Sequence, residues 1–220
     1  MSILFVLLTF LLIISLSTLR RTPDKAVAKP EVWVAPATPR MEREYGFEIP
    51  QDYCFHPGHS WVLREGPETA RIGVDSFATN LLGKIDRIEV AGLNRWVRQG
   101  QRVVKVVAGG ISLELLSPVE GVITALNHEV LQNADLITDD PYKNGWIAMV
   151  KSPDLAVNQK NLVQGTMVAP WLQQSIARLN GMLAQLSPGM AQDGGLPVKG
   201  LLSKVTPELR QKLVDEFFLS

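Results

Sequence analysis

Three side chains that can bind a transition metal stand within one short segment of the sequence. Cys54, His56 and His59 form a Cys-x-His-x-x-His pattern, and thiolate and imidazole groups are common zinc ligands. Three such ligands would leave the fourth position of a tetrahedral zinc open. The spacing matches none of the common zinc patterns, and nothing next to Cys54 favours its thiolate form. These residues are therefore weak candidates for a metal site, and we expect no bound metal.

A second candidate lies in residues 100–121, where two apolar runs flank Gly109 and Gly110. Paired glycines between two β-type runs predict a tight hairpin, because glycine readily adopts the positive φ angles of such turns. This register places Lys105 opposite Glu114, as a cross-strand pair of opposite charge. The sequence therefore predicts a hairpin with only backbone at its tip.

Short β-strands are expected to surround this hairpin. Between residues 54 and 151, runs rich in β-branched and apolar residues alternate with Gly, Asn, Asp and Pro, a pattern typical of strands and turns. One short helix interrupts them, with a cap at Asp75 or Ser76 and an end at Gly83. The expected strands are Trp61–Leu63, Arg71–Val74, Ile85–Val90, Arg102–Val107, Ser112–Leu116, Gly121–Leu126 and Trp146–Val150.

The pattern becomes helical beyond about residue 155. After Pro170, apolar residues recur three or four positions apart, at Leu172, Ile176, Leu179, Leu183 and Leu186. We expect this stripe to pack on the β domain. The alternative is self-association or a partner helix through Leu172, Ile176, Leu179 and Leu183. A last helix is expected over 206–219, and its Phe217-Phe218 pair suggests that it docks onto another surface.

The N-terminus carries a strong membrane signal. Ile3–Leu19 is a run of seventeen residues without a charge, which as a helix would span about 25 Å, near the lower limit for a bilayer core. Arg20 and Arg21 follow, and positive charge on this side predicts that the large domain faces the cytoplasm. The alternative is a cleaved signal peptide, but the run has no basic segment before it and no cleavage pattern directly after it. We expect a single-pass membrane anchor.

The composition of successive segments and the positions of the Gly- and Pro-rich stretches indicate the domain organisation. The chain divides into an anchor (1–21), a proline-rich linker (22–50), a β domain (51–155), a helical extension (156–186) and a flexible linker with a C-terminal helix (187–220). Twenty-two basic residues balance twenty-two acidic ones, so no basic excess indicates nucleic-acid binding. The single cysteine excludes an intramolecular disulfide. No catalytic triad, phosphate loop or nucleotide fingerprint is present, and we expect no enzymatic activity.

The layout of residues 100–121 resembles lipoyl and biotinyl carrier domains, in which a hairpin presents a modified lysine ahead of a Pro-Val-x-Gly turn. The flanking motifs are similar to those of the glycine cleavage system H protein family, in the same order, over roughly residues 54–180. These motifs are His56–Trp61, Ile72–Gly83, Leu126-Asn127, Asp140–Tyr142 and Gly145–Ile147. The resemblance implies a mainly β, barrel-sandwich hybrid fold with C-terminal helices.

The same resemblance places the lipoyl-lysine at Gly110, where this chain has no amine. Lipoyl attachment is an amide bond to a lysine, so the family's carrier role does not transfer to this position. We expect a membrane-anchored binding or scaffold module with protein partners and no cofactor. The alternative is a working carrier that holds lipoate on an atypical lysine, with Lys105 the nearest, or that borrows the arm of a partner domain.

Overall fold

The computed structural model describes residues 41–44, 46–186 and 198–218. All of them belong to one compact unit, Ala35–Ser220, and the other unit is Met1–Val34. The predicted anchor over residues 3–19, most of the proline-rich linker and residues 187–197 lie outside the described residues, so these predictions stay untested. Within the described ranges, no helix is both long and apolar enough to cross a membrane.

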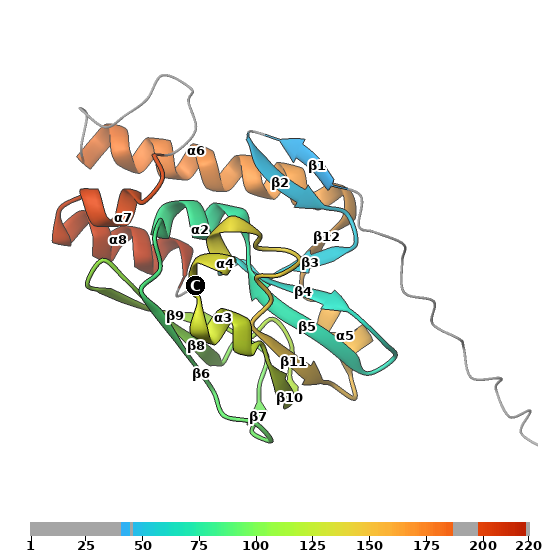
Figure 1. Cartoon of the computed structure of the whole chain (residues 1–220). Coiled ribbons are helices and arrows are strands. Elements are labelled where there is room, and N and C mark those ends of the chain that lie inside the picture. The colour runs from blue at the N-terminus through green and yellow to red at the C-terminus, as the bar shows by residue number, and fades with distance from the viewer. Residues whose placement is uncertain (1–40, 45, 187–197, 219–220) are drawn as a thin grey trace, which may run out of the picture. The chain divides into compact units, whose positions relative to one another are not determined.

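The larger of the sheets in the described part of the chain is antiparallel, with the strand order β12-β3-β4-β5-β11-β10-β7 (Figure 1). Several of its strands have only two or three residues, and they take their position from their neighbours rather than from their own pattern. Its strands are β3 (Tyr53–Phe55), β4 (Ser60–Arg64), β5 (Thr69–Val74), β7 (Trp96–Val97), β10 (Gly121–Leu126), β11 (Ala148–Lys151) and β12 (Val163–Gln164).

The side chain of Gln99 ties the two edges of this sheet together. It follows β7 on one edge, and its Nε2 donates to the carbonyls of Pro118 at 2.9 Å and Asn158 at 3.0 Å. Its Oε1 accepts a hydrogen bond of 3.0 Å from Asn161, which precedes β12 on the other edge. The sheet therefore curls towards a barrel.

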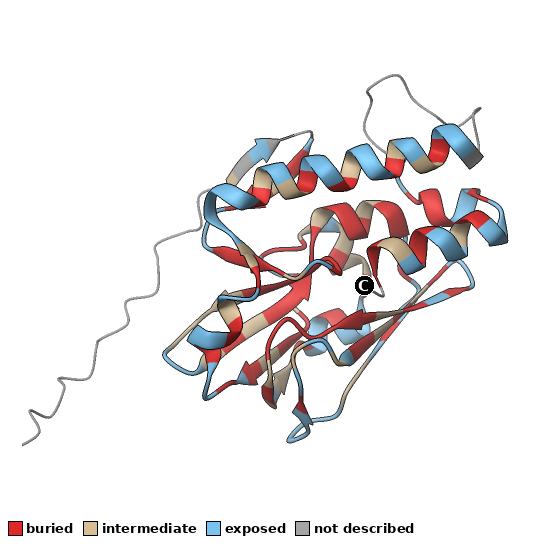
Figure 2. Cartoon of the chain, turned by 180° about the vertical axis from the view of Figure 1, so that it is seen from behind, coloured by how far each residue is buried: buried red, intermediate tan, exposed pale blue. Residues whose placement is uncertain are grey.

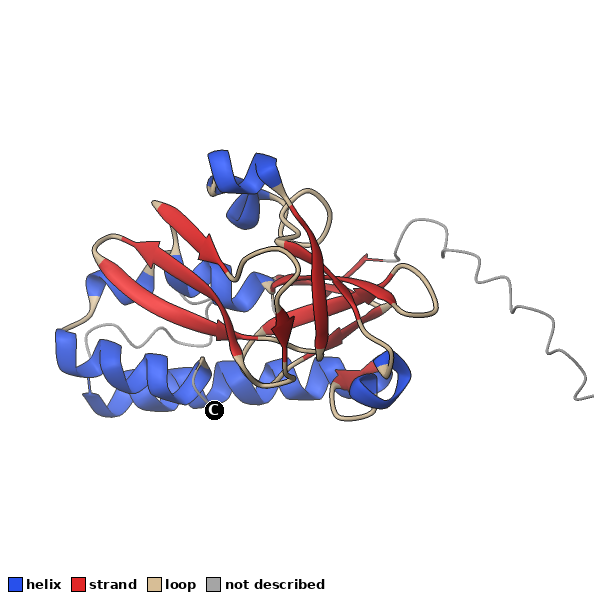
Figure 3. Ribbon diagram, turned by 90° about the horizontal axis from the view of Figure 1, so that it is seen from below, coloured by secondary structure: helices blue, strands red, loops and turns tan. Residues whose placement is uncertain are grey.

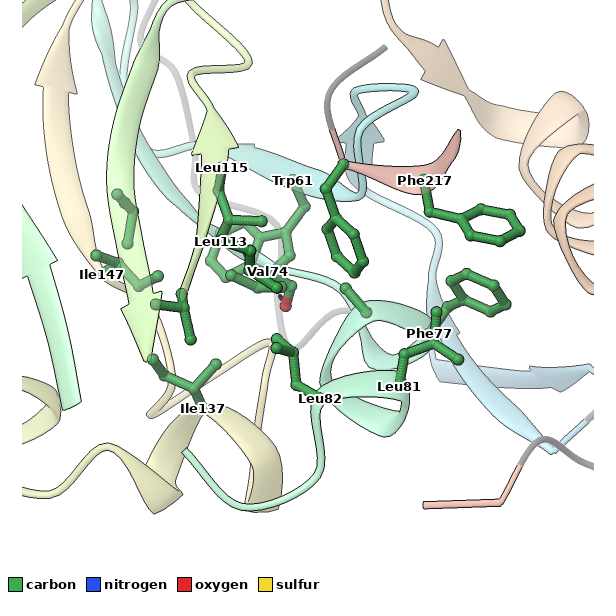
Figure 4. Packing of buried hydrophobic residues seen from close by; sticks show 14 of the residues in the cluster. Trp61, Val74, Phe77, Leu81, Leu82, Leu113, Leu115, Ile137, Ile147 and Phe217 are labelled. Atoms are coloured by element: carbon green, nitrogen blue, oxygen red, sulfur yellow. Dashed lines mark hydrogen bonds between the residues drawn. The ribbon is translucent and has the colours of Figure 1, made fainter. Parts of the chain in front are cut away.

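A second sheet contains β6 (Arg87–Val90), β8 (Arg102–Ala108) and β9 (Ile111–Leu116), in the order β6-β8-β9 among the described strands. Its apolar face covers the first sheet: Figure 4 shows Leu113 and Leu115 of β9 beside Trp61 and Val74 of the larger sheet. A separate hairpin pairs β1 (Met41–Glu44) with β2 (Phe47–Pro50). The mainly β, sandwich- and barrel-like architecture agrees with the prediction.

Helices lie on both sides of the sheets in Figure 3, with the longest helices along one side; Figure 1 labels them. The predicted short helix is α2, which begins after a cap at Asp75 and ends at Gly83. The predicted long and terminal helices are α6 and α8, which are joined by an Arg178–Glu216 ion pair of 2.7 Å. The described helices are α2 (Ser76–Leu82), α3 (His128–Gln132), α4 (Asp135–Asp139), α5 (Leu155–Gln159), the 3-10 turn η1 (Gly165–Met167), α6 (Val168–Leu186), α7 (Leu201–Lys204) and α8 (Pro207–Phe217).

The apolar stripe of α6 faces the chain's own core. Leu172, Leu179 and Leu183 are buried and Ile176 is partly buried, and Figure 2 shows buried positions recurring along a helix whose other side is exposed. The prediction that this stripe packs within the chain is confirmed. Self-association through these residues is not supported, because the side chains already have intramolecular partners.

Trp61 is the centre of the core between the sheets. Its side chain is fully buried, and its indole Nε1 donates to the carbonyls of Val74 at 2.9 Å and Pro141 at 3.1 Å. Gly73 lies opposite Trp61 on the neighbouring strand. A Cβ atom at Gly73 would stand 2.4 Å from the indole Cζ2, so this position has room only for glycine.

The substitution Gly73→Ala should therefore destabilise the fold by about 1–3 kcal/mol, because the indole ring would have to leave its hydrogen bonds or the strands would have to separate. The measurement is urea unfolding of the full chain, followed by tryptophan fluorescence. Gly92→Ala is the matched control, because a Cβ there meets nothing within 4 Å. Equal unfolding midpoints for the two variants would contradict this account of the core.

Candidate functional site

The β8–β9 hairpin ends in the predicted glycine pair. Gly109 and Gly110 have φ angles of 56° and 78°, in the left-handed region that glycine adopts without a Cβ clash. Ala108 pairs with Ile111 to close the ladder, and the predicted register of Lys105 opposite Glu114 is confirmed. The local sequence was sufficient to predict this hairpin, because the turn residues and the alternation of the strands indicate the same register.

The two glycines have different surroundings. The Gly109 N–H donates to Asp86 Oδ2 at 2.7 Å, and a Cβ at this residue would lie 3.6 Å from the Cβ of Ser203 in α7. A Cβ at Gly110 would meet nothing within 4 Å. One side of the tip is therefore held by Asp86 and lies beside α7, whereas Gly110 opens to solvent.

Lys105 forms its salt bridge with a residue other than its cross-strand neighbour Glu114. Its Nζ lies 3.9 Å from Glu89 of β6, while Glu114 pairs with Arg102 at 3.1 Å. The register of β8 shifts between Arg102 and Val104, and this bulge brings Arg102 to the exposed face that Lys105 shares. The predicted register and the cross-strand placement of Lys105 opposite Glu114 are thus confirmed, but the salt bridges of the two side chains go to other residues.

Lys105 also lies well away from the tip. Its Cα is four positions before Gly109 along β8, a distance of about 13 Å in an extended strand. Its side chain is 42% exposed, and its place in the middle of a three-stranded sheet fixes its backbone. The structure therefore does not bring this amine to the apex of the hairpin.

The three candidate metal ligands point to separate partners. Cys54 Sγ lies 3.5 Å from the side chains of Gln159 and Gln164, and burial raises the pKa of its thiol although the Gln159 hydrogen bond opposes the shift. His56 Nδ1 accepts a 3.0 Å hydrogen bond from the N–H of Gly58, and burial lowers its pKa, assisted by His59. In the described ranges, no group of three or more His, Cys, Asp or Glu is placed to hold a metal.

His59 belongs to a buried pair that the sequence did not indicate. Its Nδ1 lies 2.7 Å from Asp75 Oδ2, and both side chains are almost fully buried. A carboxylate only accepts hydrogen bonds, so Nδ1 carries the proton and donates it. The other oxygen, Oδ1, accepts from the N–H of Ala78 at 2.8 Å and caps α2. The cap was predictable from spacing, but the histidine partner, sixteen residues away, was not.

Comparison with known proteins identifies the family to which the β domain belongs. A family model described as glycine cleavage H-protein matches residues 53–175. This chain belongs to the glycine cleavage H-protein family. It is similar to the glycine cleavage system H protein of Mycobacterium avium (strain 104), with 30% identity over 109 residues that cover 50% of this chain and 83% of the relative.

Two further H proteins give similar values. That of Thermus thermophilus is 31% identical over 108 residues, covering 49% of this chain and 84% of the relative. That of Aliivibrio salmonicida is 29% identical over 115 residues, covering 52% and 90%. A crystal structure of the H protein from Mycobacterium marinum has 21% sequence identity and a TM-score of 0.49, covering 57% of this chain and 98% of that one.

The tip of this hairpin in the H-protein domain consists of two glycines and presents no side-chain amine. The strands on either side of it form an ordered hairpin, whose ladder runs without a break from the pair Val104–Leu115 to the pair Ala108–Ile111.

The chain continues beyond the family match with an extension, described over residues 176–186 and 198–218, that packs on the H-protein domain. The N–H of Gly200 donates to the carbonyl of Asn80 in α2 at 2.8 Å. A Cβ at Gly83 would come within 2.6 Å of Gly200 Cα, so the two backbones are in direct contact. Phe217 and Phe218 are buried beside the His59 ring, with centroid distances of 6.0 and 6.4 Å. The predicted docking of the terminal phenylalanines thus takes place within the chain.

Asp75→Asn tests the buried pair. The amide oxygen retains the cap of α2, but the amide nitrogen faces the Nδ1–H donor of His59 and leaves a buried group unsatisfied. We expect a loss of about 1–3 kcal/mol in the free energy of unfolding, measured by urea titration of the full chain. Asp139→Asn, at an exposed carboxylate of α4, should change it by less than about 0.5 kcal/mol. Equal effects of the two substitutions would show that the pair does not stabilise the fold.

Proposed function

We propose that this chain is a membrane-anchored member of the H-protein family that carries no lipoyl group and acts as a binding or scaffold module for other proteins. The observation that carries the proposal is the composition of the hairpin tip. Gly109 and Gly110 supply backbone where a carrier needs a projecting amine. No swinging arm can be attached at this position, so a role for the domain has to come from its surface.

The surroundings of the tip agree with a fixed surface. On one side of the turn Asp86 binds the Gly109 N–H and α7 lies beside it, whereas the space around Gly110 is open. The extension that supplies α7 is joined to the domain through buried leucines and phenylalanines, among them Leu202 and Leu213. Separating α7 from the tip would therefore expose a large part of this core to water.

The alternative is a working carrier that uses Lys105. Its exposed amine and the family membership favour it, but its position in the middle of β8 and its contact with Glu89 do not. Both functions are non-catalytic. The His59–Asp75 pair is buried away from solvent, and Cys54 and His56, the other candidate metal ligands, form hydrogen bonds with separate partners.

Lipoylation of the purified full chain decides between these functions. Wild-type protein incubated with lipoate, ATP and a lipoate ligase should show no lipoyl mass increment, because the tip has no amine. Gly110→Lys should gain one increment, since space around this residue is open, although its φ of 78° costs the lysine about 1–2 kcal/mol.

An H protein of unaltered sequence serves as the control for an active ligase. Peptide mapping of protein purified from its own cells complements the assay and should find every lysine without lipoate. A lipoyl group on Lys105, or on any other lysine of the wild-type chain, would overturn the proposal. The variants Lys105→Arg and Gly110→Lys/Lys105→Arg then assign the modified position.

Anchoring by residues 3–19, with the domain in the cytoplasm, is the second part of the proposal. We expect the full chain to remain in the membrane fraction after alkaline carbonate washing. The double variant Leu11→Arg/Leu12→Arg should move to the soluble fraction, because each charge at the centre of a membrane helix costs about 2.5–3.5 kcal/mol. Wild-type protein that leaves the membrane in carbonate would contradict the anchor.

A further inference from the structure

A loop at one edge of the larger sheet exposes apolar and basic side chains together. This loop, residues 92–98, includes the two-residue strand β7, which lies at the lower end of Figure 1, away from the C-terminal helices. Leu93 is 50% exposed and Trp96 is 48% exposed, although the chain buries most of its other large apolar side chains. Arg95 and Arg98 are exposed beside them. We call residues 92–98 the β7 loop.

The stretch of sequence that contains this loop carries only basic charge. Residues 90–113 contain Arg95, Arg98, Arg102 and Lys105 but no acidic residue, in a chain with a net charge of zero. Arg102 and Lys105 have ion-pair partners in Glu114 and Glu89. In the part of the chain that the structure describes, Arg95 and Arg98 take part in no salt bridge. Two guanidinium groups are therefore free to bind an anionic surface.

The backbone of the β7 loop is held in place. The N–H of Asn94 donates to the carbonyl of Ile123 at 2.8 Å, and the N–H of Ile123 donates to the carbonyl of Arg95 at 3.0 Å. Asn94 has a φ of 61°, a left-handed conformation that these two hydrogen bonds stabilise. The exposed side chains thus project from an ordered backbone, so little backbone conformational entropy is lost when they bind a partner.

We propose that the β7 loop docks onto the surface of an anionic lipid bilayer, with Leu93 and Trp96 at the membrane–water interface and Arg95 and Arg98 on the lipid phosphates. Tryptophan and arginine side by side are favoured at this interface. Each arginine near an anionic leaflet strengthens binding by about fivefold, the equivalent of about 1 kcal/mol. The loop is part of the H-protein domain and does not involve the hairpin tip.

The inference rests on the proposed anchor, which places the domain beside a bilayer. Twenty-one residues separate Leu19 from Met41, so the connection reaches at most about 70 Å when fully extended. A domain of this size has a radius of gyration of about 16 Å. The connection is long enough for the β7 loop to reach the bilayer whichever face of the domain carries it.

The test uses the full chain reconstituted into lipid vesicles with an environment-sensitive fluorophore on a single added cysteine. Cys54 is buried and should not react in the folded protein. The probe position is Leu93→Cys. The matched control is Met167→Cys, which is 65% exposed and follows β12, a strand that lies well above β7 in Figure 1. Vesicles of phosphatidylcholine alone are compared with vesicles that also contain phosphatidylglycerol.

We expect a blue shift of the probe at residue 93 in the phosphatidylglycerol vesicles and no shift at residue 167. High salt should reverse the shift, and Arg95→Gln/Arg98→Gln should reduce it to the value in neutral vesicles. Protein that floats with the vesicles but shows no shift at residue 93 overturns the docking inference and leaves the anchor intact. Protein that does not float overturns both. A shift that depends on an added cytoplasmic extract and not on lipid composition would assign the loop to a protein partner and refute the inference.

Discussion

One carboxylate, that of Asp75, holds together elements that lie far apart in the sequence. Its Oδ1 caps α2 and its Oδ2 accepts from His59, a residue with a φ of 61° at the turn before β4. The imidazole ring stacks on Phe77 at 4.5 Å and lies 4.8 Å from Trp171 of α6. An unpartnered carboxylate in this position would be strongly destabilising, so the pair fixes the strand turn, the first helix and the helical layer relative to one another.

The C-terminal extension depends on the same centre. Phe217 packs against the ring of Phe77 at 5.3 Å, and both terminal phenylalanines lie beside His59. Once the last helix is held there, the connection back through α7 runs beside α2 and places Ser203 next to the hairpin tip. The buried His59–Asp75 pair therefore helps to place α7 beside the Gly109–Gly110 turn, although the turn lies far from this pair in the sequence. The tip of the hairpin is thus part of the folded surface.

The sequence predicts those features of the fold that depend on residues close together in the chain. The glycine turn, the register of Lys105 with Glu114 and the cap of α2 at Asp75 follow from patterns a few residues long, and all of them are present. The sequence does not predict the salt bridges of Lys105 with Glu89 and of Glu114 with Arg102, because they depend on the pairing of β6 with β8 and on a bulge in β8 that no turn residue marks. The strands β3 and β12 have too few residues to show alternation. The closure through Gln99 joins segments about sixty residues apart, for which no local pattern exists.

The stability of the β8–β9 hairpin does not depend on a side chain at its tip. Its stability comes from the ladder between β8 and β9, from the buried side chains Val106 and Leu113 beneath it and from the contact of Gly109 with Asp86. None of these interactions involves a side chain at Gly110, because that position faces open space. A side chain at this position would add no packing, whereas glycine at a φ of 78° avoids backbone strain. The hairpin therefore folds without needing a side chain at position 110.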